Sequence, residues 1–192
     1  AFDGTKLTSF TFPASLRTIG ERAFYGCELT EITLPQALES IGKEAFASDE
    51  KLTSVTFPSS LRTIGEACFA RTGLTAVVFP EGLTTIGKSA FADLALTSVT
   101  FPSSLRTIGW AAFEETKLTA LVLPEGIETI EGYAFYGIAT LTDEVLLPES
   151  LKTVGNESFS GNQYSSTYPE AAMNRLVYTY AETLPEGFSS NI

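Results

Sequence analysis

Apolar residues recur along this chain with a period of 22 to 24 residues, separated by similar polar stretches. Prolines stand at positions 13, 35, 58, 80, 102, 124 and 148, and phenylalanines at 24, 46, 69, 91, 113, 135 and 159. Residues 52–65 and 96–109 are the identical string LTSVTFPSSLRTIG. The unit is L-T-x-h-x-h-P-x-x-L-x-x-I-G-x-x-A-F, where h is apolar. Such repetition is typical of solenoids, in which each unit packs only on its neighbours.

Each unit predicts one strand and one compact turn. Apolar and polar side chains alternate in residues 54–57, which indicates a strand, and the proline that follows ends it. Ile64, Cys68 and Phe69 have the spacing of a short helical or 3₁₀ turn that faces inward. The glycine after the isoleucine is expected to allow a tight turn or a positive φ. Because one unit cannot bury its own apolar face, we expect the strands to pair in one parallel sheet and the phenylalanines to form an interior column.

The whole chain, residues 1–192, is expected to form a single domain with three parts. Residues 1–6 match the end of a unit and are expected to close a truncated upstream unit, and residues 7–161 hold seven units. Residues 162–192 are expected to be a degenerate unit or a C-terminal cap, in which residues 169–176 could open a helix. The seventh strand region, residues 141–147, has one residue too many, which indicates a bulge.

The unit resembles the leucine-rich repeat of the BspA-like (Treponema-type) bacterial surface proteins. Their pattern L-x-x-h-x-L-P-x-x-L-x-x-I-G-x-x-A-F-x-x-C fits residues 7–27 almost throughout, with Cys27 at the last position. The resemblance implies an α/β leucine-rich-repeat solenoid with units of about 22 residues. It places a parallel sheet on the concave face and short 3₁₀ or helical turns on the convex side. It also implies a secreted or surface-attached protein, since some related proteins are adhesins for host matrix proteins or other microbes.

The composition argues against several classes of function. The net charge is −11, from 12 basic and 23 acidic residues, whereas nucleic acids are bound by clustered lysine and arginine. The chain contains no histidine, which removes histidine-dependent catalytic triads and histidine metal sites. No apolar run approaches the roughly 20 residues of a membrane span. We therefore expect no enzyme, no metal, no cofactor, no nucleic-acid partner and no membrane insertion by this segment.

Two motifs have the form of reactive sites, and the repeat accounts for both. Residues 82–89 match the phosphate-binding P-loop G-x-x-x-x-G-K-[ST], but Leu83 and Ile86 are core positions of the repeat. Lys88 stands where other units also carry charged residues. Cys27 and Cys68 fall at different repeat positions, too far apart for a disulfide, so we expect free and mostly buried thiols.

Polar residues at fixed repeat positions are interpreted as structural. Charges at one position alternate in sign and predict lateral ladders of ion pairs, Arg17–Glu39–Arg62 and Arg106–Glu128–Lys152. The threonine after the first leucine of each unit is expected to satisfy backbone groups where the chain enters the strand. Units with Ser-Leu-Arg alternate with units with Pro-Glu-Gly, which indicates duplication of a two-unit block.

Outward strand positions are the first candidates for binding a partner, because they line the expected concave sheet. They become more apolar in the later units, and the candidates are Val78, Thr100, Val122, Leu146 and the neighbouring Glu144. Exposed apolar patches often mark contact surfaces. The alternative explanation is β-propensity alone, since threonine and valine suit any strand.

An aromatic group is the second candidate. Trp110 takes a position that is polar or small in other units, and Tyr133 and Tyr136 follow one unit later. Together they would form an exposed aromatic patch, and tryptophan and tyrosine are favoured anchors at interfaces. Alternatively, Trp110 folds down over small neighbours such as Ala111.

The predicted function is a non-catalytic protein-binding module of a secreted or surface-attached, adhesin-like bacterial protein. It would recognise a host extracellular matrix protein or a microbial surface protein through the concave sheet and the aromatic patch. The alternative is a rigid spacer or targeting arm within a larger cell-surface protein. Residues 111–192 carry a net charge of −9, against −2 for residues 1–110, so a partner at the acidic end should carry a basic patch.

Overall fold

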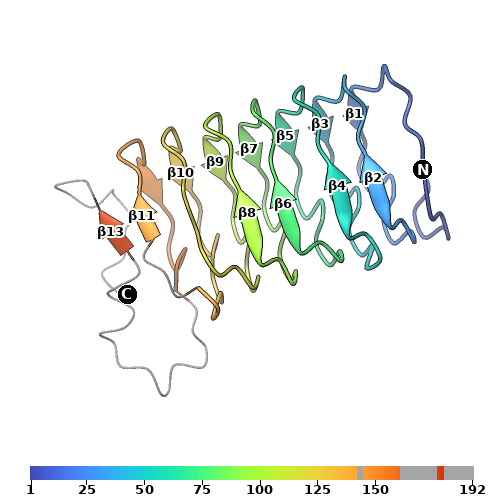
Figure 1. Cartoon of the computed structure of the whole chain (residues 1–192). Helices are drawn as coiled ribbons and strands as arrows, with labels where there is room; N and C mark the ends of the chain where they lie inside the picture. The colour runs from blue at the N-terminus through green and yellow to red at the C-terminus, as the bar shows by residue number, and fades with distance from the viewer. Residues whose placement is uncertain (142–144, 161–176, 180–192) are drawn as a thin grey trace.

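The computed structural model describes residues 1–141, 145–160 and 177–179, with only the backbone described for residues 146 and 177–179. The chain winds into coils that stack along one axis (Figure 1), and all paired strands run parallel. The protein is therefore a parallel β-solenoid. The expected helix at 169–176, most of the expected cap, and residues 142–144 of the expected bulge lie outside the described residues.

A seven-stranded parallel sheet runs the length of the solenoid and holds successive coils together. Each of its strands is two residues long and comes from the Thr-Ile segment of one coil, which reads Ser-Ile in β3 and Thr-Val in β12. Isoleucine lies beside isoleucine, as Ile64 does between Ile41 and Ile86, and points into the core. In spatial order the strands are β1 (Thr18–Ile19), β3 (Ser40–Ile41), β5 (Thr63–Ile64), β7 (Thr85–Ile86), β9 (Thr107–Ile108), β10 (Thr129–Ile130) and β12 (Thr153–Val154).

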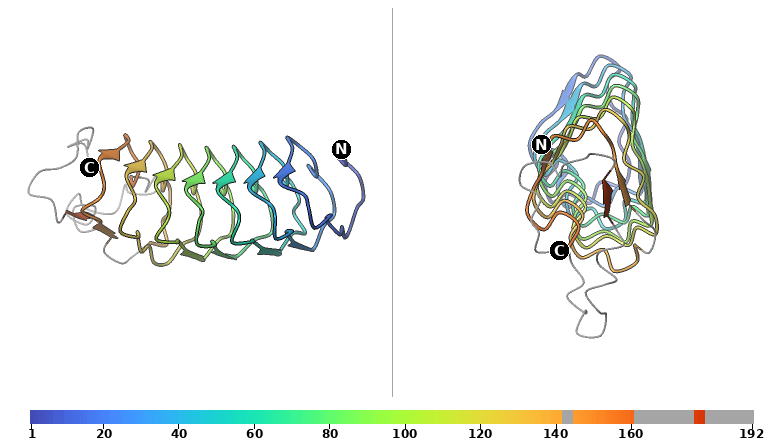
Figure 2. Two further views of the ribbon diagram at one scale, coloured as in Figure 1. Left: turned by 90° about the horizontal axis from the view of Figure 1, so that it is seen from above. Right: turned by 90° about the vertical axis from the view of Figure 1, so that its left-hand side faces the viewer.

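The Leu-Thr segments form a second row of strands on the opposite side of the coils (Figure 2). We call this surface the Leu-Thr row. Its strands pair only two by two: β2 (Glu31–Thr33) with β4 (Ser54–Thr56), β6 (Ala76–Val78) with β8 (Ser98–Thr100), and β11 (Val145–Leu147) with β13 (Val177–Thr179). The prediction of one continuous sheet from these segments is therefore wrong. The continuous sheet forms next to the glycine that follows each isoleucine. Because this glycine has no Cβ, the backbones of adjacent coils approach closely there.

That glycine is required by close approach, and of the two expected reasons, a tight turn or a positive φ, the positive φ does not occur at this position. A Cβ on Gly65 would lie 2.7 Å from the carbonyl carbon of Gly42, and one on Gly109 would lie 2.7 Å from that of Gly87. Gly20, in the first coil, has nothing within 4 Å of its Cβ position. The glycine therefore sets the distance between coils.

The turn after each Thr-Ile strand differs from the predicted helical or 3₁₀ turn, and residues 1–141, 145–160 and 177–179 contain no helix. The residue two positions before the column phenylalanine is left-handed in each coil, for example Ala67 (φ 48°) and Ser89 (φ 51°). Left-handed backbone interrupts a right-handed helix. The N–H groups point to the next coil instead: Ala67 donates to the Lys88 carbonyl at 2.7 Å, and Phe69 donates to the Ala90 carbonyl at 2.9 Å.

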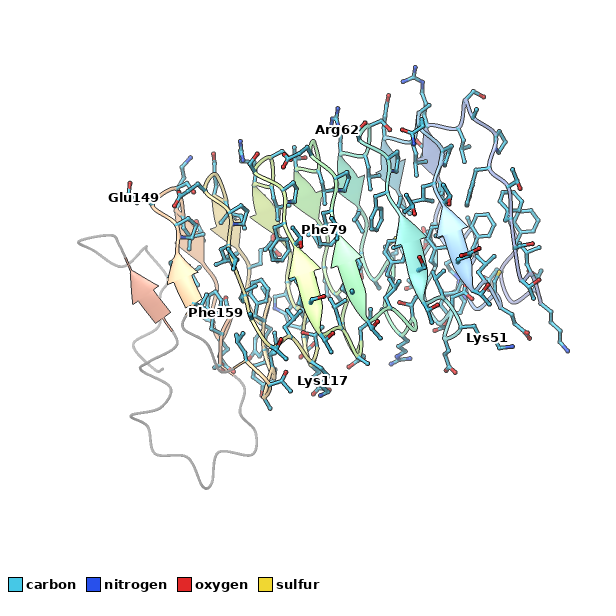
Figure 3. All side chains as sticks on the ribbon, in the orientation of Figure 1. Lys51, Arg62, Phe79, Lys117, Glu149 and Phe159 are labelled. Carbon is cyan, nitrogen blue, oxygen red and sulfur yellow. The ribbon has the colours of Figure 1, made fainter. Side chains whose placement is uncertain are left out.

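Phenylalanine rings form the predicted column through the interior. From Phe24 to Phe159, neighbouring ring centroids are 5.3–5.5 Å apart and the rings are nearly parallel. A second set of rings meets this column edge-on, as Phe79 meets Phe91 at 73°. Figure 3 shows Phe79 and Phe159 between the two edges of the coils, where charged side chains such as Lys117 project. The buried column is therefore a central part of the hydrophobic core.

The expected ion-pair ladders form only at their ends. Arg17 pairs with Glu39, and Lys152 pairs with Glu128 at 2.8 Å. Among the described residues no ion pair joins Arg62 to Glu39.

The guanidinium groups in the middle of the ladders have another role. Arg62 and Arg106 each donate to a carbonyl of their own turn, Arg106 to the Ser103 carbonyl at 3.0 Å. Each also covers a glycine of the next coil, and a Cβ on Gly126 would lie 2.6 Å from Nη1 of Arg106. This contact gives a structural reason for the alternation of Ser-Leu-Arg with Pro-Glu-Gly units.

Threonine hydroxyls link the coils where the chain enters the Leu-Thr row. Thr97 donates to the Thr75 carbonyl at 3.1 Å, and Thr53 donates to the Thr30 carbonyl at 3.3 Å. These bonds confirm the predicted role for those threonines. In the described part of the chain there is no helix of the length and apolar character that membrane spanning requires.

Candidate functional site

Two large apolar side chains of the Leu-Thr row project into solvent. Val78, in β6, is 70% exposed, and Val122, two coils later, is 79% exposed. Thr100 pairs in register with Val78 and is also exposed, so the three candidates share one face. The side chains of Leu146 and Glu144 lie outside the described side chains.

The three aromatic candidates lie together, and we call Trp110, Tyr133 and Tyr136 the aromatic cluster. The ring centroids of Trp110 and Tyr133 are 5.4 Å apart with planes inclined by 47°, and those of Tyr133 and Tyr136 are 5.1 Å apart with planes inclined by 55°. Trp110 is 40% exposed, and both tyrosines are half-buried. All three follow the Thr-Ile strands β9 and β10, whose pairing fixes the spacing of the two turns.

A departure from the repeat creates the surface on which Trp110 lies. In the coil that follows the one with Trp110, Glu131 replaces the usual glycine after the isoleucine, and Gly132 follows it. A Cβ on Gly132 would lie 3.4 Å from Cδ1 of Trp110, so the indole rests over this glycine of the next coil. The Glu131 carboxylate accepts a hydrogen bond from the Trp110 backbone N–H at 2.8 Å. Trp110 and Glu131 both depart from the repeat, and the stacking of the coils joins them.

Charged groups surround the aromatic cluster on two sides. Nζ of Lys88 lies 4.9 Å from the Trp110 ring centroid, a cation–π contact. The Glu157 carboxylate, with smaller contributions from burial and Glu114, raises the pKa of Tyr133. Burial, together with the negative charges of nearby carboxylates, raises the pKa of Glu114. The indole side therefore carries a cation, and the tyrosine side carries carboxylates.

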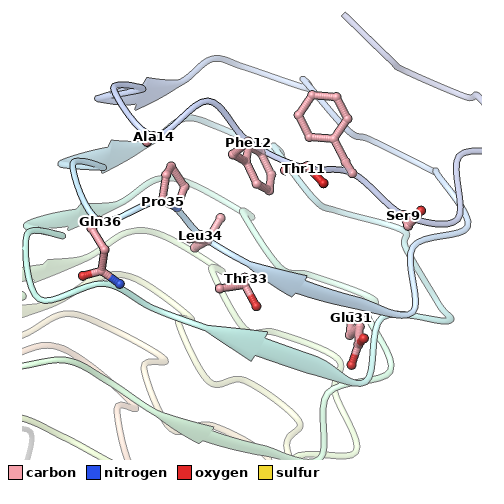
Figure 4. Close-up of a pocket in the computed structure, with 10 residues that line it drawn as sticks. Ser9, Thr11, Phe12, Ala14, Glu31, Thr33, Leu34, Pro35 and Gln36 are labelled. Carbon is pink, nitrogen blue, oxygen red and sulfur yellow. The ribbon is translucent and has the colours of Figure 1, made fainter.

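A cavity of about 520 Å³ opens elsewhere, between the first two coils (Figure 4). Residues 9–12 of the first coil form no described ladder with β2, which leaves this space open. Glu31 is the sole titratable residue among those that line it. General acid–base catalysis by paired carboxylates needs two groups with different pKa values, and this lining supplies one. None of the predicted binding residues lines the cavity.

Among the described residues Asp49 has the most strongly shifted carboxyl pKa, and it lies inside the solenoid. Its side chain is fully buried, its Oδ1 accepts a hydrogen bond from the Leu29 N–H at 3.0 Å, and its Oδ2 has no hydrogen-bond partner in the described part of the chain. Burial raises the pKa of Asp49 to about 7. Perturbed pKa values often mark active sites, but a substrate in solvent cannot reach this group.

The remaining motifs are absorbed by the fold. Within residues 82–89, Leu83 and Ile86 are fully buried. The N–H groups of Gly82 and Gly87 already donate to neighbouring coils, to the Ser104 hydroxyl and the Ile64 carbonyl respectively. Cys27 and Cys68 are free and buried, and burial raises the pKa of both thiols. No group of three or more potential metal-ligating side chains occurs within the described residues.

Comparison with known proteins agrees with the solenoid geometry. A family model described as the BspA type leucine rich repeat region, with six copies, matches residues 1–114 and 106–176. The chain belongs to the BspA-type leucine-rich repeat family. Family membership thus confirms the resemblance seen in the sequence. No curated protein matches the chain.

Solved structures of other bacterial leucine-rich repeat proteins are similar to this chain. A leucine-rich repeat protein from Bacteroides ovatus is 31% identical over 82% of this chain, with a TM-score of 0.71. A leucine-rich repeat protein of T. pallidum is 28% identical over 77% (TM-score 0.49), and a leucine-rich cell surface protein of Faecalibacterium prausnitzii is 21% identical over 93% (TM-score 0.46). The chain covers 40%, 63% and 58% of these three proteins respectively.

Proposed function

We propose that this chain is a non-catalytic protein-binding module of a secreted or surface-attached bacterial protein. Its partner is a host extracellular matrix protein or a protein on a microbial surface. The contact surface comprises the aromatic cluster and the Val78, Thr100 and Val122 face of the Leu-Thr row, continued toward Leu146 and Glu144. The observation that carries the proposal is the exposure of Trp110, 40%, at a repeat position that other coils fill with polar or small residues.

The rigidity of the solenoid supports this proposal. The turn that carries Trp110 is bonded to both neighbouring coils, because Ser89 donates to the Trp110 carbonyl at 2.7 Å and Trp110 donates to Glu131. A preorganised surface loses little conformational entropy on binding. Tryptophan and tyrosine are also the residues that most often dominate binding energy at interfaces.

Membership of the BspA-type family supports a location outside the cell and a role without catalysis. The cavity between the first two coils, with its single titratable residue, also favours binding over chemistry. The spread of acidic residues toward the later coils favours a partner with a basic patch, and such binding weakens as salt rises.

A binding screen tests the proposal. The chain and its Trp110→Ala and Val122→Glu variants are titrated against immobilised host matrix proteins and microbial surface proteins. Thr56→Glu is the matched control, because Thr56 is an exposed residue at the same repeat position as Val122 in an earlier coil. We expect at least a tenfold loss of affinity for the first two variants and none for the control. Silence against every target, or equal binding by all variants, contradicts the proposal.

A rigid spacer is the second candidate, favoured by the seven-stranded sheet that ties the coils into one rod. A spacer holds another domain at a distance and binds nothing through this segment. The same screen separates the two functions, since a spacer gives no binding that depends on Trp110.

A further inference from the structure

The aromatic cluster also indicates which chemical group of a partner it would contact, an inference that rests on the proposed function. Its ring planes are inclined by 47° and 55°, so the rings do not stack as a flat platform. Inclined aromatic rings present their negative faces in more than one direction, which suits a cationic group. The conformation of the cluster is held by the paired strands beneath it, β9 and β10.

The aromatic cluster has a positive charge at its Trp110 end and negative charges at its tyrosine end. Lys88 lies over the indole ring of Trp110, so a second cation is repelled from that face. On the other side, the stacking of the coils brings two carboxylates close: the Tyr133 N–H donates to the Asn156 carbonyl at 3.0 Å, next to Glu157, and the Glu115 N–H donates to the Tyr136 carbonyl at 2.8 Å, next to Glu114. Both carboxylates act on the hydroxyl of Tyr133. Glu131 is less available to a partner, because one of its oxygens accepts the Trp110 N–H.

We propose that the tyrosine side of the aromatic cluster binds a positively charged side chain, arginine or lysine, on the surface of the partner protein. The rings of Tyr133 and Tyr136 contact the cation, and the carboxylates of Glu157 and Glu114 neutralise its charge. Trp110 forms the adjoining wall, and Lys88 directs the cation away from it. The contact thereby selects a basic group at one defined position of the interface.

The single tryptophan of the chain gives a direct readout, since its fluorescence reports on the cluster alone. The probe is the blocked peptide Gly-Arg-Gly-Arg-Gly, and its control is the same peptide with citrulline, a neutral analogue, in place of arginine. We expect a saturable change in Trp110 fluorescence with the arginine peptide only. The half-saturation concentration should rise at least about threefold in Glu157→Gln and in Tyr133→Leu.

Glu125→Gln is the matched variant, because it removes one negative charge from an exposed glutamate in a different turn of the coil. It should leave the half-saturation concentration unchanged, whereas Lys88→Gln should lower it. Equal responses to the arginine and citrulline peptides overturn the proposal, as does an equal effect of Glu125→Gln and Glu157→Gln. Glu114→Gln serves as the second test of the carboxylates if Glu157→Gln does not fold.

The two proposals fail in different ways. If a protein partner is lost with Val122→Glu but not with Glu157→Gln or Tyr133→Leu, the cation site is wrong and the binding module stands. If the arginine peptide gives the expected pattern while no surface protein binds, the cation chemistry stands and the proposed function fails.

Discussion

Phe113 and Trp110 are aromatic residues of the same turn, three positions apart, with opposite environments. Phe113 is fully buried and lies between Phe91 and Phe135, with centroids 5.4 and 5.5 Å away. Trp110 is 40% exposed and has Tyr133 as its ring neighbour. The phenylalanine recurs in each coil, whereas the tryptophan occurs once. The comparison teaches that residues obeying the repeat build the scaffold, and that residues breaking it are the candidates for recognition.

Replacing these two aromatic residues tests the contrast with the largest expected effect. Phe113→Ala leaves a cavity in the column and should lower the free energy of unfolding by about 3–5 kcal/mol. Trp110→Ala removes a partly exposed ring and should cost about 1 kcal/mol or less. Urea denaturation followed by circular dichroism measures both. Equal losses would show that Trp110 is a structural residue.

Asp49 tests how strictly the interior excludes charge. Its pKa in the folded state is about 7, against 3.8 for the free side chain, so the folded protein binds the proton more tightly than the unfolded chain does. The contribution of Asp49 to the free energy of unfolding is therefore fully present below pH 3.8. It falls as the pH rises toward 7 and does not change further above that pH. The total loss in the free energy of unfolding is on the order of 4 kcal/mol.

The Asp49→Asn variant should remove this pH dependence and be more stable at pH 7.5 than the native chain. Its amide retains an oxygen to accept the Leu29 N–H. Its amide N–H can donate as the Thr72 and Thr116 hydroxyls do at this repeat position, each to a phenylalanine carbonyl at 2.9 Å. The charge of Asp49 also acts on the thiol of Cys27. Burial raises the pKa of that thiol above its ordinary value, so Cys27 does not titrate between pH 4 and 8. Thermal melts from pH 4 to 8 measure the effect, and parallel profiles for both proteins would contradict it.

Glycine at the close approach between coils gives the next effect. Gly65→Ala places a Cβ against the backbone of the preceding coil and should cost about 1–3 kcal/mol, because backbone must move. Gly20→Ala is the control at the same repeat position with open space around it, and should change stability by less than about 0.5 kcal/mol. Urea midpoints compare the two, and a similar cost at both positions would argue for conformational strain instead.

The smallest effect separates two arginines of one repeat position. Arg62→Gln removes hydrogen bonds to its own turn and the cover over Gly82, and should cost about 1 kcal/mol. Arg17→Gln removes an exposed ion pair with Glu39 and should cost about 0–0.5 kcal/mol. Denaturation at low and high salt measures both, and only the Arg17 effect should fall with salt. If the loss of stability in Arg62→Gln fell with salt, Arg62 would take part in the ion-pair ladder that the sequence predicted.

The sequence predicted features that follow from identity between units. The phenylalanine column, the parallel pairing and the contact of Trp110 with Tyr133 all depend on equivalent positions that lie one coil apart. The predicted helical or 3₁₀ turn was not confirmed, because the spacing of Ile64, Cys68 and Phe69 alone does not distinguish a helical turn from the left-handed turn that forms. Which of them forms depends on hydrogen bonds to the next coil, and local periodicity does not contain that information.

The residues of the aromatic cluster could be predicted from the sequence, but most of their contacts with adjacent coils could not. Trp110 was identified because it departs from the repeat, and Glu131 departs from it as well. Their hydrogen bond joins adjacent coils, as does the contact of the indole with Gly132. Aligning each residue with its neighbour one unit later, and not only with its own unit, is the signal that would have found these partners. The same alignment brings Lys88 beside Trp110.

The affinity of Trp110→Ala for a surface protein that binds the native chain tests the central claim most directly. The claim is that the repeat supplies a rigid scaffold and that the residues departing from it supply recognition. We predict a dissociation constant at least tenfold higher for Trp110→Ala, with the urea midpoint close to that of the native chain. An unchanged dissociation constant in this folded variant would contradict the claim.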